Sequence, residues 1–134
     1  MQEQTGRPGT NPGIGKLAAV MIGVTDLDRS LAFYHEKLGL PLQWRHSDAN
    51  RSLAFLDAQG VIVGLSTEVG KMATPQAGAM EVVFGVDSVQ ASYRALTSRG
   101  IQFLGEPKQA TPTEWVANFR DPDGHLLSVF GPKG

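Results

Sequence analysis

The sequence predicts an α+β fold in which two β-α-β-β-β modules pair into curved mixed sheets around a cavity, with the helices outside. The main observation is an internal repeat at a constant offset of 62 residues, because Val24, Leu27, Ser30, Leu31 and Tyr34 are matched by Val86, Val89, Ser92, Tyr93 and Leu96. A second pair of turn glycines, Gly60 and Gly124, keeps nearly the same offset. The chain has 134 residues, which is the length of one domain, so the repeat lies inside that domain.

The first module begins with a strand that leads into a helix. Residues 16–24 are mostly apolar with β-branched members, and Asp26 follows as a helix-capping residue. Apolar residues then recur at the spacing of one helix face, at Leu27, Leu31, Tyr34 and Leu38. Gly39 is suited to the left-handed conformation that commonly ends a helix.

Three strands are expected to complete the first module. They cover residues 42–46, 52–56 and 61–66, and turn-forming residues separate them. Residues 68–78 show no apolar period and contain Pro75, so they are interpreted as a connection.

The second module repeats this order. A strand at 80–86 precedes Ser88, a second capping residue, and the next helix ends at Gly100. Strands are expected at 101–104, 115–119 and 126–130, the last two joined by a tight turn at 121–124. We therefore assign residues 16–134 to one domain, with modules at 16–68 and 79–132 and a linker at 69–78, after a flexible Gly- and Pro-containing tail at 1–15.

Composition excludes several classes of function. The net charge is −1 without a block of basic residues, which argues against a nucleic-acid partner. The absence of cysteine excludes disulfides and Cys-ligated zinc and is compatible with a cytoplasmic location. Because no apolar run is long enough to span a bilayer, we expect no membrane partner.

Two motifs carry a family resemblance. The stretch Val24-Thr25-Asp26-Leu27-Asp28-Arg29-Ser30-Leu31-Ala32-Phe33-Tyr34 with Leu38-Gly39-Leu40, and the later Asp121-Pro122-Asp123-Gly124-His125, resemble the vicinal oxygen chelate superfamily, also called the glyoxalase/bleomycin-resistance/dioxygenase fold. The resemblance implies the paired-module fold, and it implies a homodimer. It does not fix a reaction, because the superfamily includes isomerases, epimerases, dioxygenases, thiol transferases and proteins that sequester drugs.

The resemblance also implies four positions at which family enzymes hold a divalent metal ion. Carried over to this chain, they fall at Ala19, Gly64, Glu81 and Ser128. Only Glu81 is a firm metal ligand, whereas a catalytic site typically needs about three protein ligands. We therefore expect no cofactor, and a divalent metal only if the protein uses an unconventional ligand set.

Glu81 is the one candidate catalytic residue. It is interpreted either as a cavity-facing general base or hydrogen-bond acceptor, or as a strand-edge carboxylate that is exposed or paired with an arginine. His125 follows a tight turn, and an exposed position with a structural role is expected for it instead of metal binding.

Aromatic residues in the predicted strands indicate a ligand-binding cavity. Together with Ser128 they form the predicted ligand-binding set, which consists of Trp44, Phe55, Phe103, Trp115 and Phe119. Filling of the core is the alternative explanation for some of them. The sequence thus predicts a metal-independent protein that binds an aromatic or apolar small molecule. The alternative is a lyase, isomerase or dioxygenase with an unconventional metal site or with Glu81 as general base.

Overall fold

A computed structural model describes residue 13 and residues 17–72 and 80–134, which form two mixed four-stranded sheets. The first sheet has the order β1-β4-β3-β2, with β1 (Ala19–Gly23), β2 (Leu42–Ser47), β3 (Ser52–Ala58) and β4 (Val61–Ser66). The second has the order β5-β8-β7-β6, with β5 (Glu81–Gly85), β6 (Lys108–Gln109), β7 (Trp115–Arg120) and β8 (Leu126–Gly131). The predicted α+β class with two modules is confirmed.

The internal repeat extends to strand register. In each sheet the first strand runs parallel to the last, and the last is antiparallel to its other neighbour. Met21 lies opposite Gly64 in the first sheet, and Val83 lies opposite Ser128 in the second. These pairs occupy corresponding places in the two modules, so the repeat can be followed residue by residue into the site.

Side-chain caps start the two main helices as the sequence predicts. The Asp26 carboxylate accepts a hydrogen bond from the Arg29 amide at 3.1 Å and starts α1 (Leu27–Leu31), and Ser88 caps α3 (Val89–Ser98) in the same way. The first helix then widens into the π-helix η1 (Ala32–Lys37), with the Leu38 amide donating to the Phe33 carbonyl five residues back. Apolar spacing does not predict this wide turn.

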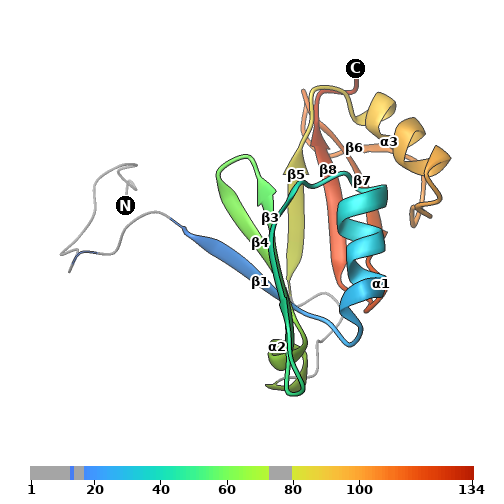
Figure 1. The fold of residues 1–134 in the computed structure, drawn as a ribbon. Helices are drawn as coiled ribbons and strands as arrows, with labels where there is room; N and C mark the ends of the chain where they lie inside the picture. The colour runs from blue at the N-terminus through green and yellow to red at the C-terminus, as the bar shows by residue number, and fades with distance from the viewer. Residues whose placement is uncertain (1–12, 14–16, 73–79) are drawn as a thin grey trace.

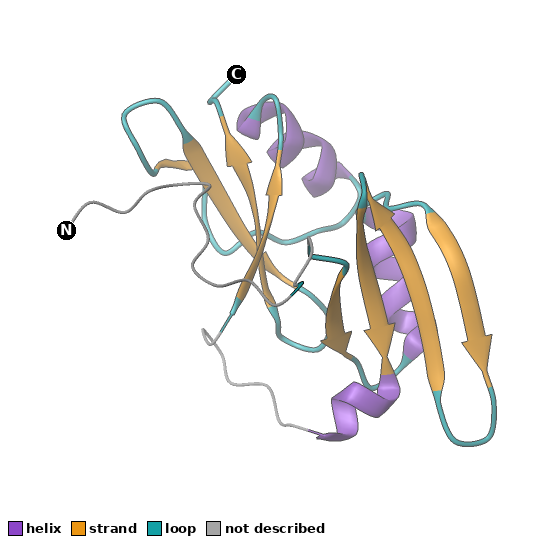
Figure 2. Cartoon of the chain, turned by 90° about the vertical axis from the view of Figure 1, so that its left-hand side faces the viewer, coloured by secondary structure: helices purple, strands orange, loops and turns teal. Residues whose placement is uncertain are grey.

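One hydrophobic core serves both modules. In Figure 1 α1 and α3 lie on one side of the strands, and Figure 2 views the sheets from the opposite side. Phe33 of η1 packs against Phe119 of β7 at a ring distance of 6.2 Å, so the first helix also contacts the second sheet. None of the helices in the described ranges is long and apolar enough to cross a bilayer.

Two expected elements differ from the structure. The predicted connection after β4 starts with a short helix, α2 (Thr67–Met72). Its Gly70 lies against the backbone of β1, where a Cβ atom would come within 2.5 Å of the Val24 carbonyl oxygen. The glycine that suggested a loop is therefore needed for close packing of a helix.

The strand expected at 101–104 is also wrong. Phe103 forms only an isolated bridge to Phe119, and the edge strand β6 forms further along, at Lys108–Gln109. The Leu104 amide still donates to the Asn118 carbonyl oxygen, and Pro107, which has no backbone N–H to donate to a ladder, separates this contact from β6. The expected tail and part of the expected linker (1–12, 14–16 and 73–79) lie outside the described residues.

Candidate functional site

Both sheets present a face that is not covered by α1 or α3, and this open face contains the candidate site (Figure 2). Strand alternation decides which side chains reach it. In the first sheet Gly64 lies opposite both Met21 and Phe55, and a Cβ atom at Gly64 would collide with the Met21 thioether. The missing side chain at position 64 therefore makes room for Met21.

Trp44 is the largest apolar side chain on this part of the face. It lies opposite Phe55 in the β2–β3 pair, with a ring distance of 5.1 Å, and its other neighbour His46 stacks on it at 6.0 Å. The exposed fractions are 46% for Trp44 and 41% for Met21. The structure thus brings together Trp44 and Phe55, two of the predicted ligand-binding residues, on a partly solvated aromatic surface.

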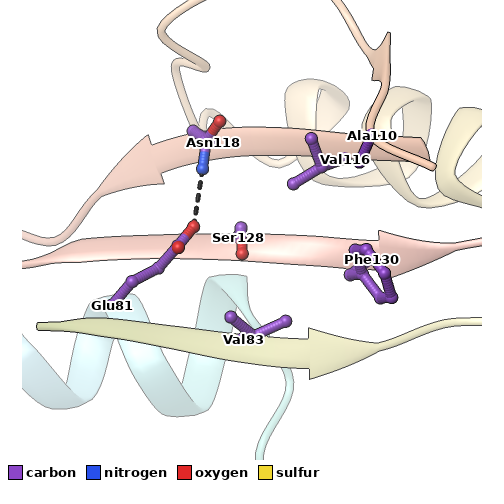
Figure 3. Close-up of a pocket in the computed structure, with 7 residues that line it drawn as sticks. All are labelled: Glu81, Val83, Ala110, Val116, Asn118, Ser128 and Phe130. Atoms are coloured by element: carbon purple, nitrogen blue, oxygen red, sulfur yellow. Dashed lines mark hydrogen bonds between the residues drawn. The ribbon is translucent and has the colours of Figure 1, made fainter. Parts of the chain in front are cut away.

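The second sheet carries a hollow of about 490 Å³ on its open face. It is lined by side chains from all four strands of the sheet or their ends, which are Glu81, Val83, Ala110, Val116, Asn118, Ser128 and Phe130 (Figure 3). Most of these side chains are apolar, as small-molecule sites commonly are. Glu81 and Ser128 are the predicted site residues that the hollow brings together.

The polar part of the hollow consists of Glu81, Asn118 and Ser128. The Asn118 amide Nδ2 donates a hydrogen bond of 2.7 Å to Glu81 Oε2 across β8 (Figure 3). Ser128 on β8 lies between β7 and β5, opposite Asn118 on one side and Val83 on the other. Its hydroxyl is fully buried and has no hydrogen-bond partner in the described part of the chain. Such a group carries a desolvation cost of about 1–3 kcal/mol.

Glu81 combines features of both alternatives considered from the sequence. It lines the hollow, it is solvent-exposed at the start of β5, and its hydrogen-bond partner is Asn118 and not an arginine. A carboxylate in this position can accept hydrogen bonds or a proton from a molecule in the hollow.

The four positions implied for a metal ion do not fit one. Ala19 and Gly64 have no side-chain donor, and the Met21 thioether occupies the space beside Gly64. Ser128 offers a hydroxyl, and Glu81 a single carboxylate. In the ranges that the structure describes, no group of three or more His, Asp or Glu side chains could hold a metal ion. Hard divalent ions prefer several charged oxygen or imidazole donors at once, which this set does not supply.

Three predicted aromatic residues lie away from the open face. Phe119 is fully buried in the core and packs against Phe33, and Phe103 packs between Phe119 and Tyr93. Alternation along β7 explains this placement, because Asn118 takes the open side and Phe119 must then face the helices. Trp115 is half-buried under the Lys133 ammonium group, at 4.7 Å from its ring centroid. The prediction that these residues wall the cavity is corrected accordingly.

The Asp121–His125 turn, between β7 and β8, joins the two modules. Asp121 accepts a 2.7 Å hydrogen bond from the buried Tyr34 hydroxyl, and His125 Nε2 lies 2.7 Å from the Gly23 carbonyl oxygen. Burial, followed by the negative charge of Asp121, raises the pKa of Tyr34 well above its ordinary value. The structural role expected for His125 agrees with this contact, but the expected exposure is wrong, because the side chain is partly buried against the first module.

Sequence reasoning missed Asn118 and the apolar lining of the hollow. Strand alternation contains the signal, because Val83 follows Glu81 by two residues and Phe130 follows Ser128 by two. Asn118 is a polar residue between the buried Ala117 and Phe119, which indicates that its side of the strand is open. Phe119 was predicted because it is aromatic, although alternation along the strand places it on the face opposite to Asn118.

Comparisons with known proteins agree with this architecture. The family model for the Glyoxalase/Bleomycin resistance protein/Dioxygenase superfamily matches residues 16–129. The chain is 30% identical to the uncharacterised protein YraH of Bacillus subtilis, over 86% of this chain and 97% of that protein. It is 28% identical to a probable lactoylglutathione lyase of Vibrio parahaemolyticus, over 89% of this chain and 92% of that protein.

A solved structure has the same architecture. The crystal structure of TnmS3, an antibiotic-binding protein from Streptomyces sp. CB03234, matches with a TM-score of 0.74 at 22% identity, covering 91% of this chain and 99% of TnmS3. At this identity the likeness concerns the fold alone.

Proposed function

The chain belongs to the glyoxalase/bleomycin resistance protein/dioxygenase superfamily, and we propose that within it this protein binds an apolar or aromatic small molecule without a metal ion. The observation that carries the proposal is the aromatic surface of the first sheet. Trp44 is 46% exposed although Phe55 and His46 pack against its ring. A planar ligand would remove this apolar area from water, which is the main favourable term in binding such a molecule.

The hollow of the second sheet offers a second apolar surface to a ligand. Val83 is 51% exposed there, and Val116 and Phe130 lie beside it. Small-molecule sites typically combine walls of this kind with a few polar groups that fix orientation. Glu81, Asn118 and Ser128 supply those groups.

The donor set supports the metal-free part of the proposal. Of the four positions that the family resemblance implies, Glu81 alone carries a charged oxygen donor, and Met21 fills the place beside Gly64. Elemental analysis of protein purified without chelator is expected to find no stoichiometric Ni, Zn, Mn or Fe. One tightly bound ion per chain would contradict metal independence.

Binding can be tested with 4-nitrobenzyl alcohol, because nitroaromatic compounds quench tryptophan fluorescence on contact. The protein should carry Trp115→Phe, so that Trp44 is the one remaining tryptophan. We expect saturable quenching of Trp44, and Phe55→Ala should weaken the apparent affinity by about tenfold, since a buried aromatic contact contributes about 1.5–3 kcal/mol. Strictly linear, collisional quenching that Phe55→Ala leaves unchanged would refute the proposal.

A second candidate function is proton-transfer catalysis with Glu81 as the base. The exposed Glu81 carboxylate at the hollow favours it, and the similarity to a probable lactoylglutathione lyase suggests the class of reaction to assay. Glu81→Gln separates the two candidates. A catalyst should lose most of its turnover while keeping its substrate affinity, whereas a binding protein has no turnover to lose.

A further inference from the structure

The free hydrogen-bonding groups in the hollow of the second sheet are predominantly acceptors. One N–H of the Asn118 amide donates to Glu81, which leaves its second N–H as a donor and its carbonyl oxygen as an acceptor. The second carboxylate oxygen of Glu81 is also free in the described structure, and the Ser128 hydroxyl has no partner there. A ligand group that matches this surface must donate several hydrogen bonds.

The charge in the hollow has one sign. Glu81 is the one ionised residue among those that line it. Two basic residues share this face by register without lining the hollow: Lys108, opposite Val116 at the edge of the sheet, and Arg120, whose guanidinium donates a hydrogen bond to the Gly124 carbonyl oxygen. The hollow therefore favours a positive group over a negative one.

From these two observations we propose that the polar end of the ligand is a protonated primary amine, attached to an aromatic or apolar body. This inference rests on the proposed function. A primary ammonium group has three N–H donors and no acceptor, which matches the carboxylate, amide and hydroxyl oxygens of the hollow. Glu81 pairs with its charge, while Val83, Val116 and Phe130 contact the adjoining apolar part.

The ammonium group of a ligand can replace Asn118 as the hydrogen-bond partner of Glu81. The existing Asn118–Glu81 hydrogen bond joins a neutral amide to a carboxylate, and a cationic donor makes a stronger bond to the same carboxylate. When the ammonium group replaces Asn118 as the partner of Glu81, the amide side chain is released from its position across β8. The buried Ser128 hydroxyl, next to Asn118 in register, then becomes accessible as a further acceptor.

The test compares three probes that differ only in the polar group: 4-nitrobenzylammonium, 4-nitrobenzyl alcohol and 4-nitrobenzoate. Binding is followed near pH 7 and at low salt by the amide chemical shifts of Val83 and Ser128, which lie in the hollow. We expect the ammonium probe to bind about five- to tenfold more tightly than the alcohol, and the carboxylate to bind most weakly.

Glu81→Gln should abolish the preference for the ammonium probe, and the matched control Glu36→Gln should keep it, because Glu36 is an exposed carboxylate on η1. Ser128→Ala gives an independent readout. It should raise the melting temperature of the free protein, because a buried hydroxyl without a partner is removed, and it should lower affinity for the ammonium probe by about threefold.

The outcomes separate this inference from the proposed function. Equal affinity for all three probes, or tightest binding of 4-nitrobenzoate, would refute the amine while leaving an apolar binding site. A preference for the ammonium probe that survives Glu81→Gln would also refute it. If none of the probes binds saturably, both proposals fail.

Discussion

Replacing Tyr34 by Phe tests how the two modules are held together. The Tyr34 side chain is fully buried, and its hydroxyl donates a 2.7 Å hydrogen bond to Asp121 Oδ2. Hydrogen bonds to charged groups contribute about 1.5–3 kcal/mol, and the substitution leaves a buried carboxylate oxygen without this donor. The other oxygen, Oδ1, keeps the amides of Asp123 and His125. We therefore expect the free energy of unfolding to fall by about 2–3 kcal/mol near pH 7.

The pH dependence gives the same substitution a second signature. The pKa of Tyr34 is raised in the folded protein above its ordinary value of 10.0. A raised pKa contributes stability that is fully present below about pH 10 and is lost as the pH rises, because the unfolded chain ionises first. Above pH 10 the difference between wild type and Tyr34→Phe should therefore shrink, by at most about 1.4 kcal/mol per pH unit.

Urea unfolding followed by circular dichroism at about pH 7, 9 and 10.5 measures both effects. Tyr93→Phe is the matched control, because Tyr93 packs on Phe103 but its hydroxyl makes no hydrogen bond in the described part of the chain. The control should change stability by less than about 0.5 kcal/mol. A Tyr34→Phe effect as small as the control, or one that does not decline above pH 10, would refute the reasoning.

Two further predictions concern packing and acid stability. Gly70→Ala should destabilise the protein by about 1–3 kcal/mol in urea unfolding, because the new Cβ atom would collide with the Val24 carbonyl oxygen. The control Gly105→Ala should be nearly neutral, because a Cβ atom there has no other atom within 4 Å. Equal effects of the two substitutions would contradict the packing argument. A hydrogen bond from His46, followed by backbone amides, lowers the pKa of Asp48 from 3.8 to about 2, so its stabilising contribution is present above 3.8 and is lost as the pH falls towards 2. In thermal melts the wild type should accordingly have a higher melting temperature than Asp48→Asn at pH 6 and nearly the same melting temperature at pH 2. A difference in melting temperature that stays constant between the two pH values would contradict this explanation.

The sequence was sufficient to predict the scaffold because the repeat locates helix caps, helix faces and strands in both modules. The caps at Asp26 and Ser88 and the strand at Val61–Ser66 agree with the structure, since each depends on local chemistry or on a short apolar run. The helix α2 was not predicted because its Gly70 suggested a loop. The reason for the glycine is close contact with β1, which lies far away in sequence.

The candidate site was only partly predictable. Glu81 and Ser128 line the hollow. Both could be predicted because the 62-residue offset and the turn at Gly124 indicate which residues of β5 and β8 share one face of the sheet. Phe103 and Phe119 were misplaced because aromatic character does not distinguish the two faces of a half-buried strand. Asn118 could not be predicted, because its role depends on a hydrogen bond to Glu81 that joins β7 to β5 across β8 and so requires the strand order to be known.

The contacts of the Asp121–His125 turn also determine when folding can finish. Its bonds to Tyr34 and Gly23 span 87 and 102 residues of the chain. Contacts over such separations form late, because a long loop must first be closed. During synthesis β1 to β4 emerge well before the turn, so the Tyr34 hydroxyl has no Asp121 carboxylate to bind until the turn has also emerged. The buried contacts of the first module are thus completed by the β7–β8 turn of the second, which makes the folding of the first module depend on the second.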